Sequence, residues 1–199
     1  KLTKNPVYGV VADTGLDESV RNVVSEANIL MDGIDILVNC AARPLANKKI
    51  HNFGDLTTES FDREMNVKVM GYIRCAREVA PIMKRRGWGR IINISGLASR
   101  STGNVVGSMR NVAVSALTKN LADELGPFGI NVIVIHPGFT RTEATESFII
   151  ERASELGKEP KEVEVELAKN NSVNRVIEST DIAYVATMIA SPKSIAING

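Results

Sequence analysis

The feature that most constrains the fold is a regular alternation of short apolar runs with long stretches of helical periodicity. The runs are rich in β-branched residues and almost unbroken in hydrophobicity, which is typical of strands covered on both faces of a parallel sheet. Strands are expected at residues 8–12, 34–38, 90–94 and 130–135. Helices are expected at residues 17–31, 60–86, 108–125, 143–156, 161–169 and 180–190. This alternation predicts an α/β fold with a doubly wound parallel sheet between two helical layers.

The longest expected helix carries signals at both of its ends. Ser60 is expected to cap a helix that runs to about Arg86, and basic residues fill its last turn. Gly87 is expected to end the helix, since glycine is favoured just beyond a helix C-terminus.

Composition narrows the class of protein. The chain has 199 residues, of which 44% are hydrophobic, and this size suits one domain with a substantial core. With 24 basic and 23 acidic residues, the net charge of +1 predicts no nucleic-acid or membrane partner. Cys40 and Cys75 lack metal-ligand spacing, so we expect packed, reduced thiols, no metal site and a cytoplasmic protein. The expected partner is a small-molecule substrate or ligand.

Five short patterns follow one another along the chain. Asp13 follows the first expected strand, LVNCAA occupies residues 37–42, and Asn66 lies in MNVKVMG. INIS ends at Ser95, and HPGFTRT spans residues 136–142. In this order and at these strand ends, the patterns resemble the short-chain dehydrogenase/reductase family over nearly the whole chain. The resemblance implies a three-layer αβα fold of the Rossmann type and a nicotinamide-dependent oxidoreductase.

The resemblance also implies where a dinucleotide, NAD or NADP, would bind. Open parallel sheets bind ligands at the carboxyl ends of their strands. The residues expected to contact the cofactor are Asp13, Thr14, Asn39, Cys40, Ala41, Ala42, Pro137, Gly138, Thr140 and Thr142. Small residues such as Gly138 let the backbone approach a flat cofactor closely. Simpler roles stay open, because Asp13 could cap the following helix and Pro137 with Gly138 could form only a turn.

One motif of such a fold is absent from the sequence. Dinucleotide-binding folds begin with a glycine-rich turn that holds the pyrophosphate at a helix N-terminus, and this chain has none. Its first strand resembles the family's third, and SIAING at residues 194–199 resembles the start of the family's last strand. We therefore expect residues 1–199 to be a single Rossmann-type domain from a longer polypeptide, without the first βαβ unit and the last strand. The choice between NAD and NADP would depend on the absent unit.

The expected active-site loop lacks the family's chemical groups. Family members use a tyrosine as acid or base, a lysine four residues later, and a serine in the preceding loop. The resemblance places the tyrosine position at Gly107, the lysine position at Asn111 and the serine position at Gly96. Ser95 lies one residue early, and of the four expected catalytic residues only Asn66 keeps the family's residue type.

No neighbouring residue replaces these groups in the sequence. None of the tyrosines lies in or beside residues 96–107, and Lys119 lies about 12 Å along the helix from Asn111. Arg110 has no usable proton near neutral pH, and the serine hydroxyls of the loop lack a base. His136, at a strand end, is expected to be packed rather than catalytic.

Three functions remain open. The first is an oxidoreductase that still transfers hydride between NAD(P) and a small carbonyl or alcohol substrate, because hydride transfer needs only contact between the two. The second is a non-catalytic NAD(P)-binding pseudoenzyme, used as a sensor or assembly module, and the third is a purely structural protein. The resemblance implies a homodimer or homotetramer formed through helices 60–86 and 108–125. Residues 143–172 are expected to form a substrate lid.

Overall fold

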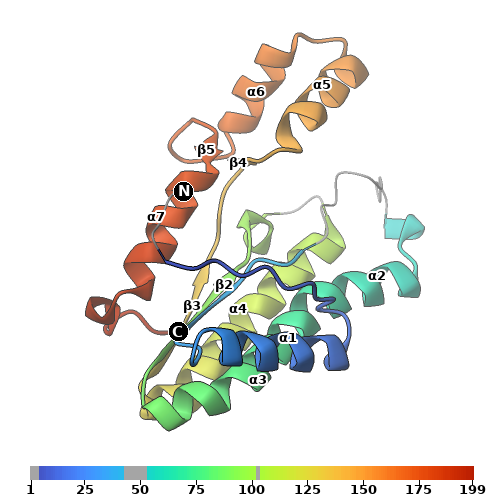
Figure 1. Cartoon of the computed structure of the whole chain (residues 1–199). Coiled ribbons are helices and arrows are strands. Elements are labelled where there is room, and N and C mark those ends of the chain that lie inside the picture. Colours follow the sequence, from blue (N-terminus) through green and yellow to red (C-terminus); the bar gives the residue numbers. More distant parts are fainter. Residues whose placement is uncertain (1–4, 43–52, 102–103) are drawn as a thin grey trace.

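The computed structural model describes residues 5–42, 53–101 and 104–199. Its main sheet is parallel, in the order β1–β2–β3, and consists of β1 (Ile36–Asn39), β2 (Gly89–Ile94) and β3 (Ile130–Ile135). A separate parallel pair joins β4 (Thr140–Arg141) to β5 (Ile177–Glu178). The parallel sheet and the helices around it confirm the predicted α/β fold (Figure 1).

Helices cover both faces of the main sheet. On one face lie α3 (Gly71–Arg86) and α4 (Val105–Leu125), and α1 (Asp17–Leu30) packs against α3. On the other face lies α7 (Ser179–Ala190). The remaining helical segments in the described residues are η2 (Phe53–Asp55), α2 (Thr58–Glu64), η3 (Met65–Met70), η4 (Leu97–Ser99), η5 (Gly126–Phe128), α5 (Thr145–Leu156), α6 (Pro160–Ala168) and η6 (Pro192–Ser194).

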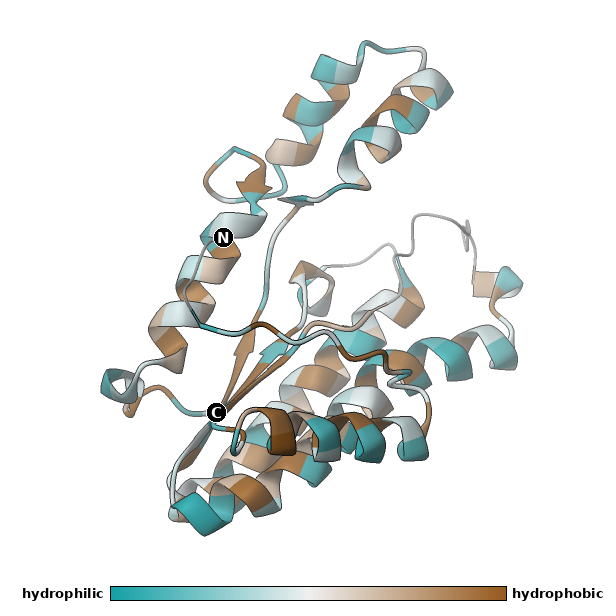
Figure 2. Ribbon diagram, viewed as in Figure 1, coloured by the Kyte–Doolittle hydropathy of each residue, from teal (hydrophilic) through white to brown (hydrophobic). Residues whose placement is uncertain are grey.

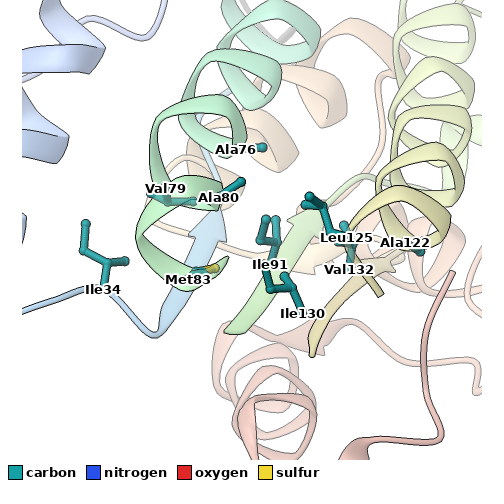
Figure 3. Packing of buried hydrophobic residues seen from close by; sticks show 10 residues of the cluster. All are labelled: Ile34, Ala76, Val79, Ala80, Met83, Ile91, Ala122, Leu125, Ile130 and Val132. Atoms are coloured by element: carbon teal, nitrogen blue, oxygen red, sulfur yellow. The ribbon is translucent and has the colours of Figure 1, made fainter. Parts of the chain in front are cut away.

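The hydrophobic core follows from the alternation of side chains along the strands. Ile91, Ile130 and Val132 point to one face and are fully buried against α3 and α4 (Figure 3). Their neighbours Ile92 and Ile133 point to the opposite face and pack towards α7. Because both faces are covered, β2 and β3 read as unbroken apolar runs, which is why the sequence located them well.

The long helix of residues 60–86 differs from its prediction at its start and in its middle. Thr57 is the N-cap and forms a capping box with Ser60, so Ser60 lies inside the helix instead of capping it. Between α2 and α3 the chain forms a π-helical turn, η3, which widens the helix and displaces its side chains. Gly87 ends α3 in the left-handed conformation with φ 67°, as predicted.

The expected strand at residues 8–12 is not formed. A strand needs a neighbouring strand for its hydrogen bonds, and no strand of the described residues pairs with this segment. The segment crosses in front of the sheet in Figure 1, and Val11 is 99% exposed. Ile36 and Val38 of β1 are also exposed, which leaves apolar residues uncovered here (Figure 2). Cys40 is exposed as well, so the expectation of a packed thiol is wrong for it.

The expected lid forms a helical hairpin beside the sheet. α5 and α6 pack on each other through Ile149, Ala153 and Val163, and both project beyond the carboxyl ends of the strands (Figure 1). The pair β4–β5 fixes the base of this hairpin. No helix in the described part of the chain has the length and apolar character needed to cross a membrane.

Candidate functional site

Two loops meet where β2 and β3 end. The Ser95 amide donates to the Ile135 carbonyl at 2.8 Å, and the Leu97 amide donates to the Pro137 carbonyl at 3.0 Å. These bonds continue the parallel pairing beyond the strands, so the loop after β2 and the Pro-Gly turn after β3 lie side by side. The carboxyl edge of the sheet therefore joins two of the segments that the sequence singled out.

The turn at Asp13 lies against the π-helical turn η3. The Gly15 amide donates to Asp13 Oδ1 at 2.8 Å, so this carboxylate closes its own turn. The Thr14 hydroxyl donates to the Val67 carbonyl at 3.2 Å, and Asn66 Nδ2 donates to the Gly15 carbonyl at 3.1 Å. Helix α1 has no side-chain cap, so the alternative in which Asp13 caps it is not what the structure has.

Arg74 fastens this turn to the helix. Its guanidinium is 9% exposed and donates to Asp17 Oδ2 at 3.1 Å, to the Thr14 carbonyl at 3.0 Å and to Asn66 Oδ1 at 2.8 Å. The planar fork of donors suits this set of acceptors, which come from three separate residues. Sequence reasoning missed Arg74, although its position one turn after η3 on a buried face was a usable signal.

Lys68 points from η3 towards the other side of the site. Its Nζ atom donates to the Ser95 carbonyl at 2.9 Å and to Asn111 Oδ1 at 3.0 Å, and the residue is only 3% exposed. Burial, with the positive charge of nearby Arg110, lowers the pKa of Lys68 to about 8. Sequence reasoning did not select Lys68; a lysine on the inward side of an otherwise apolar helix was the available signal.

Asn66 and Lys68 thus serve different neighbours. The amide of Asn66 is used by Gly15 and Arg74, so the structure does not bring it to Ser95, Gly96 or Asn111. Lys68 makes the contact with that loop instead. The two residues are two positions apart, and at about 100° per residue such side chains point to nearly opposite sides of a helical segment.

The loop after β2 packs closely on α4. The Ser95 hydroxyl donates to the Asn111 carbonyl at 3.1 Å and is buried there. A Cβ atom placed on Gly96 would lie 3.1 Å from Asn111 Nδ2. The Gly107 amide, in the first turn of α4, is capped by Asn104 Oδ1 at 2.6 Å. The structure therefore brings Ser95, Gly96 and Asn111 together, and Ser95 is occupied by a backbone acceptor.

Two further side chains lie at or near the start of this loop. The Tyr72 hydroxyl donates to the Ile94 carbonyl at 2.8 Å, at the last residue of β2. Burial raises the pKa of Tyr72, which opposes a role as proton donor. His136 Nδ1 lies 3.1 Å from Ser99 Oγ, so this serine hydroxyl does have an imidazole neighbour. Ser99 Oγ also donates to the Gly96 carbonyl, and this bond uses its proton within the loop.

At the end of β1 the polar groups serve the sheet. Asn39 is buried and donates from Nδ2 to Asn93 Oδ1 at 2.9 Å, and Asn93 continues to Thr118. The side chain of Asn39 is thus used by β2 and α4, which leaves its backbone and the following residues for a ligand. Cys40 and Ala42 are exposed, and Ala41 is half-buried.

The Pro-Gly turn is held by a residue far along the chain. Asn171 Oδ1 accepts from the Phe139 amide at 2.8 Å, and a Cβ atom on Gly138 would lie 1.9 Å from the same oxygen. Glycine at this position therefore admits Asn171, whereas the sequence suggested that it admits a cofactor. The Thr140 hydroxyl donates to the Gly138 carbonyl, and the Thr142 amide donates to the hydroxyl of Thr145, the first residue of α5. Asn171 carried no signal in the sequence, because its contact depends on the tertiary fold.

Comparisons with known proteins agree with this architecture. Residues 1–199 match the family model described as enoyl-(acyl carrier protein) reductase. The short-chain reductase protein NovJ of Streptomyces niveus is 33% identical over 187 residues, which cover 94% of this chain and 68% of that protein. The chloroplastic NADPH-dependent aldehyde reductase 2 of Arabidopsis thaliana is 34% identical and covers 98% of this chain and 69% of its own.

A solved structure gives the same picture. Sorbitol-6-phosphate 2-dehydrogenase SrlD from Erwinia amylovora superposes with a TM-score of 0.83 at 26% identity, covering 96% of this chain and 75% of that one. The match to the family model spans residues 1–199 and therefore includes the strands, the loop after β2 and the Pro-Gly turn described above. The chain belongs to the short-chain dehydrogenase/reductase family.

Proposed function

We propose that this protein binds NAD or NADP at the carboxyl edge of β1–β3 and transfers hydride to or from a small carbonyl or alcohol substrate. One observation carries the proposal: η3 touches the Asp13 turn through Val67 and the loop after β2 through Lys68, and that loop touches Pro137. The segments therefore line one edge of a parallel sheet, which is where open α/β sheets bind dinucleotides.

The family supports the choice of cofactor. The Arabidopsis relative is named as NADPH-dependent, and family membership makes a nicotinamide dinucleotide the first ligand to test. The candidate contacts are the turns at residues 13–15, 39–42 and 137–142. Gly138 itself faces Asn171, so in this proposal the cofactor meets the other side of that turn.

A specific observation favours a second function. Gly96, Gly107 and Asn111 carry no side chain that gives or takes a proton at neutral pH. Loss of a positioned acid or base typically costs about 10²- to 10⁴-fold in rate. The alternative is accordingly a pseudoenzyme that keeps the dinucleotide for sensing or assembly and turns over ordinary carbonyls very slowly.

Two measurements on the full-length protein separate these functions. Titration with NADH and NADPH, followed by fluorescence, tests binding, and a single-turnover assay with a panel of aldehydes and ketones tests hydride transfer. Binding with oxidation of the bound cofactor supports the oxidoreductase, and binding without oxidation supports the pseudoenzyme. Failure to bind either dinucleotide contradicts both.

We also propose a homodimer, built on the outer surfaces of α3 and α4. A groove of about 310 Å³ lies between these helices and is mainly apolar, with Ala80, Leu117 and Leu121 among its lining residues. Charged residues, Lys84 and Glu124 among them, also line it. Sedimentation of the full-length protein and of the Leu121→Asp variant tests this proposal, which predicts a dimer for the first and a monomer for the second.

A further inference from the structure

Lys68 is a buried cation without a carboxylate partner. Among the described residues its Nζ atom bonds only to two oxygens, the Ser95 carbonyl and Asn111 Oδ1. The nearby carboxylate, Glu64, is already paired with Arg110 in a buried ion pair. An isolated buried charge is costly and is rarely kept without a use.

The bond from Lys68 also determines how the Asn111 amide is oriented. Because Oδ1 accepts from the ammonium, Nδ2 must point the other way, towards Gly96. Asn111 is 4% exposed, and Nδ2 has no acceptor within the part of the chain that the structure describes. An unpaired amide donor of a buried residue therefore lies beside the place where the family resemblance puts the serine hydroxyl.

We infer that Lys68 and Asn111 together replace the family's lysine: Asn111 Nδ2 donates to a ligand oxygen above Gly96, and Lys68 positions and polarises that amide. The inference rests on the proposed function, because the ligand is the dinucleotide or its substrate. The oxygen belongs to a ribose hydroxyl of the cofactor or to the substrate carbonyl, both of which accept such a bond. Asn111 contacts the ligand, and Lys68 acts through Asn111.

The environment of Lys68 makes its interaction with Asn111 sensitive to pH. Arg110 on α4 and burial disfavour its proton, whereas Glu64 on α2 and Cys40 after β1 favour it. Tyr72 on α3 lies with its ring centroid 6.0 Å from Nζ and stays neutral because burial raises its pKa. With a pKa of about 8, Lys68 loses its charge within an accessible pH range, and the amide then loses its polarisation.

The test measures affinity for NADH and NADPH from about pH 6.5 to about pH 9.5, a range that spans the titration of Lys68. An ordinary hydrogen bond contributes about 0.5 to 1.5 kcal/mol, so wild-type affinity for the ligand that carries the oxygen should fall by at most about tenfold across the range as the Asn111 amide loses its polarisation. Lys68→Gln and Asn111→Ala should show the weak affinity at every pH. Lys119→Gln removes an exposed lysine from the same helix as Asn111 and should retain the wild-type pH profile.

The binding results distinguish an oxygen on the cofactor from an oxygen on the substrate. If the cofactor affinities of Lys68→Gln and Asn111→Ala fall, the ligand oxygen is on the ribose. If only binding of a carbonyl inhibitor to the cofactor complex weakens, the oxygen is on the substrate. Unchanged binding of both ligands, with a flat wild-type pH profile, overturns the inference and leaves the proposed function standing. No dinucleotide binding by wild type overturns both. Should Lys68→Gln not fold, as circular dichroism would reveal, the wild-type and Lys119→Gln profiles still decide between these results.

Discussion

Two cations on one helical segment hold the two halves of the site, and they do so by different means. Arg74 fastens the Asp13 turn through Asp17, Thr14 and Asn66. Lys68 fastens the loop after β2 through Ser95 and Asn111 and has no carboxylate of its own. Arginine stays charged at every relevant pH, whereas a buried lysine loses its proton readily.

The difference teaches which half of the site can respond to its surroundings. The Arg74 contacts form a fixed support, since each guanidinium nitrogen has an acceptor and a counter-charge is present. The Lys68 contacts depend on a proton whose pKa is about 8. The Asp13 turn therefore has permanent contacts, whereas the contacts of the loop after β2 change with the protonation of Lys68.

The largest expected effect is a loss of stability when Arg74, which holds the Asp13 turn, is replaced. Arg74→Met leaves the Thr14 carbonyl and Asn66 Oδ1 without their buried donor, while Asp17 keeps Arg77, and each buried acceptor left unpaired typically costs about 1 to 3 kcal/mol. Chemical denaturation measures the free energy of unfolding. Arg77→Met is the matched control, because Arg77 also binds Asp17 but is half-exposed, so solvent screens the pair and the substitution should cost much less. If the two variants lose the same free energy of unfolding, Arg74 holds the Asp13 turn no more strongly than an exposed arginine does.

The titration of Lys68 should make the stability of the protein depend on pH. The pKa of Lys68 is about 8 in the folded protein and ordinarily 10.5, so between these values the unfolded chain binds more protons. This group therefore makes the protein more stable as pH rises from about 8 to 10.5, by about 3 kcal/mol in all. Denaturation curves of wild type and Lys68→Gln over this range measure it.

The comparison of the two proteins isolates Lys68 from other groups. Burial raises the pKa values of Cys40, Cys75 and Tyr72, and these groups act in the opposite direction at high pH. The effects of Cys75 and Tyr72 are common to both proteins and cancel in the difference, whereas that of Cys40 does not, because the charge of Lys68 lowers the pKa of this thiol. A constant difference in unfolding free energy across the range would mean that Lys68 titrates as an ordinary exposed lysine.

The sequence predicted the fold well where local pattern and tertiary environment agree. β2 and β3 are covered on both faces, so their apolar runs carried the information. Residues 8–12 show the same apolar pattern, yet they form no strand because no described strand pairs with them. A strand needs a partner that its own residues cannot specify.

The site was predictable only in its outline. Motif positions located the turns at Asp13, Asn39, Ser95 and Pro137, because the carboxyl ends of parallel strands share one edge. The residues that hold those turns escaped prediction, since Lys68, Arg74 and Asn171 act on parts of the chain distant in sequence. Helical periodicity alone puts Asn66 and Lys68 on different sides of their segment, but which loop each side chain reaches depends on the tertiary fold.

A smaller change tests how closely the Asp13 turn must pack against the helix at Gly71. A Cβ atom on Gly71 would lie 3.0 Å from Thr14 Cβ and 3.3 Å from the Thr14 carbonyl oxygen. Gly71→Ala should therefore push the Asp13 turn away from η3 and cost about 1 to 3 kcal/mol. Thermal denaturation measures the loss, and Gly54→Ala, where a Cβ atom meets nothing within 4 Å, is the control. If Gly71→Ala is as stable as its control, the turn is not held by close packing.

The smallest expected effect concerns restoring the family's serine, tyrosine and lysine in the loop after β2 and in α4. Gly96→Ser, Gly107→Tyr and Asn111→Lys together would place a second ammonium close to Lys68, whose Nζ now lies 3.0 Å from Asn111 Oδ1. Repulsion in a buried site would deprotonate one of the two amines. The triple variant should therefore reduce a model ketone about tenfold more slowly than a quadruple variant that adds Lys68→Asn, within the range for a positioned proton donor.

Lys119→Gln in place of Lys68→Asn is the matched control for that quadruple variant, and it should leave the activity of the triple variant unchanged. Steady-state kcat/KM with NADPH and NADH makes the comparison. A gain that appears only with Lys68→Asn means that Lys68 already supplies the charge that the lysine position lacks, so that adding another lysine is harmful until Lys68 is removed. Equal activity with and without Lys68→Asn would mean that the two lysine positions are independent, and the distinction between Arg74 and Lys68 would then concern stability alone.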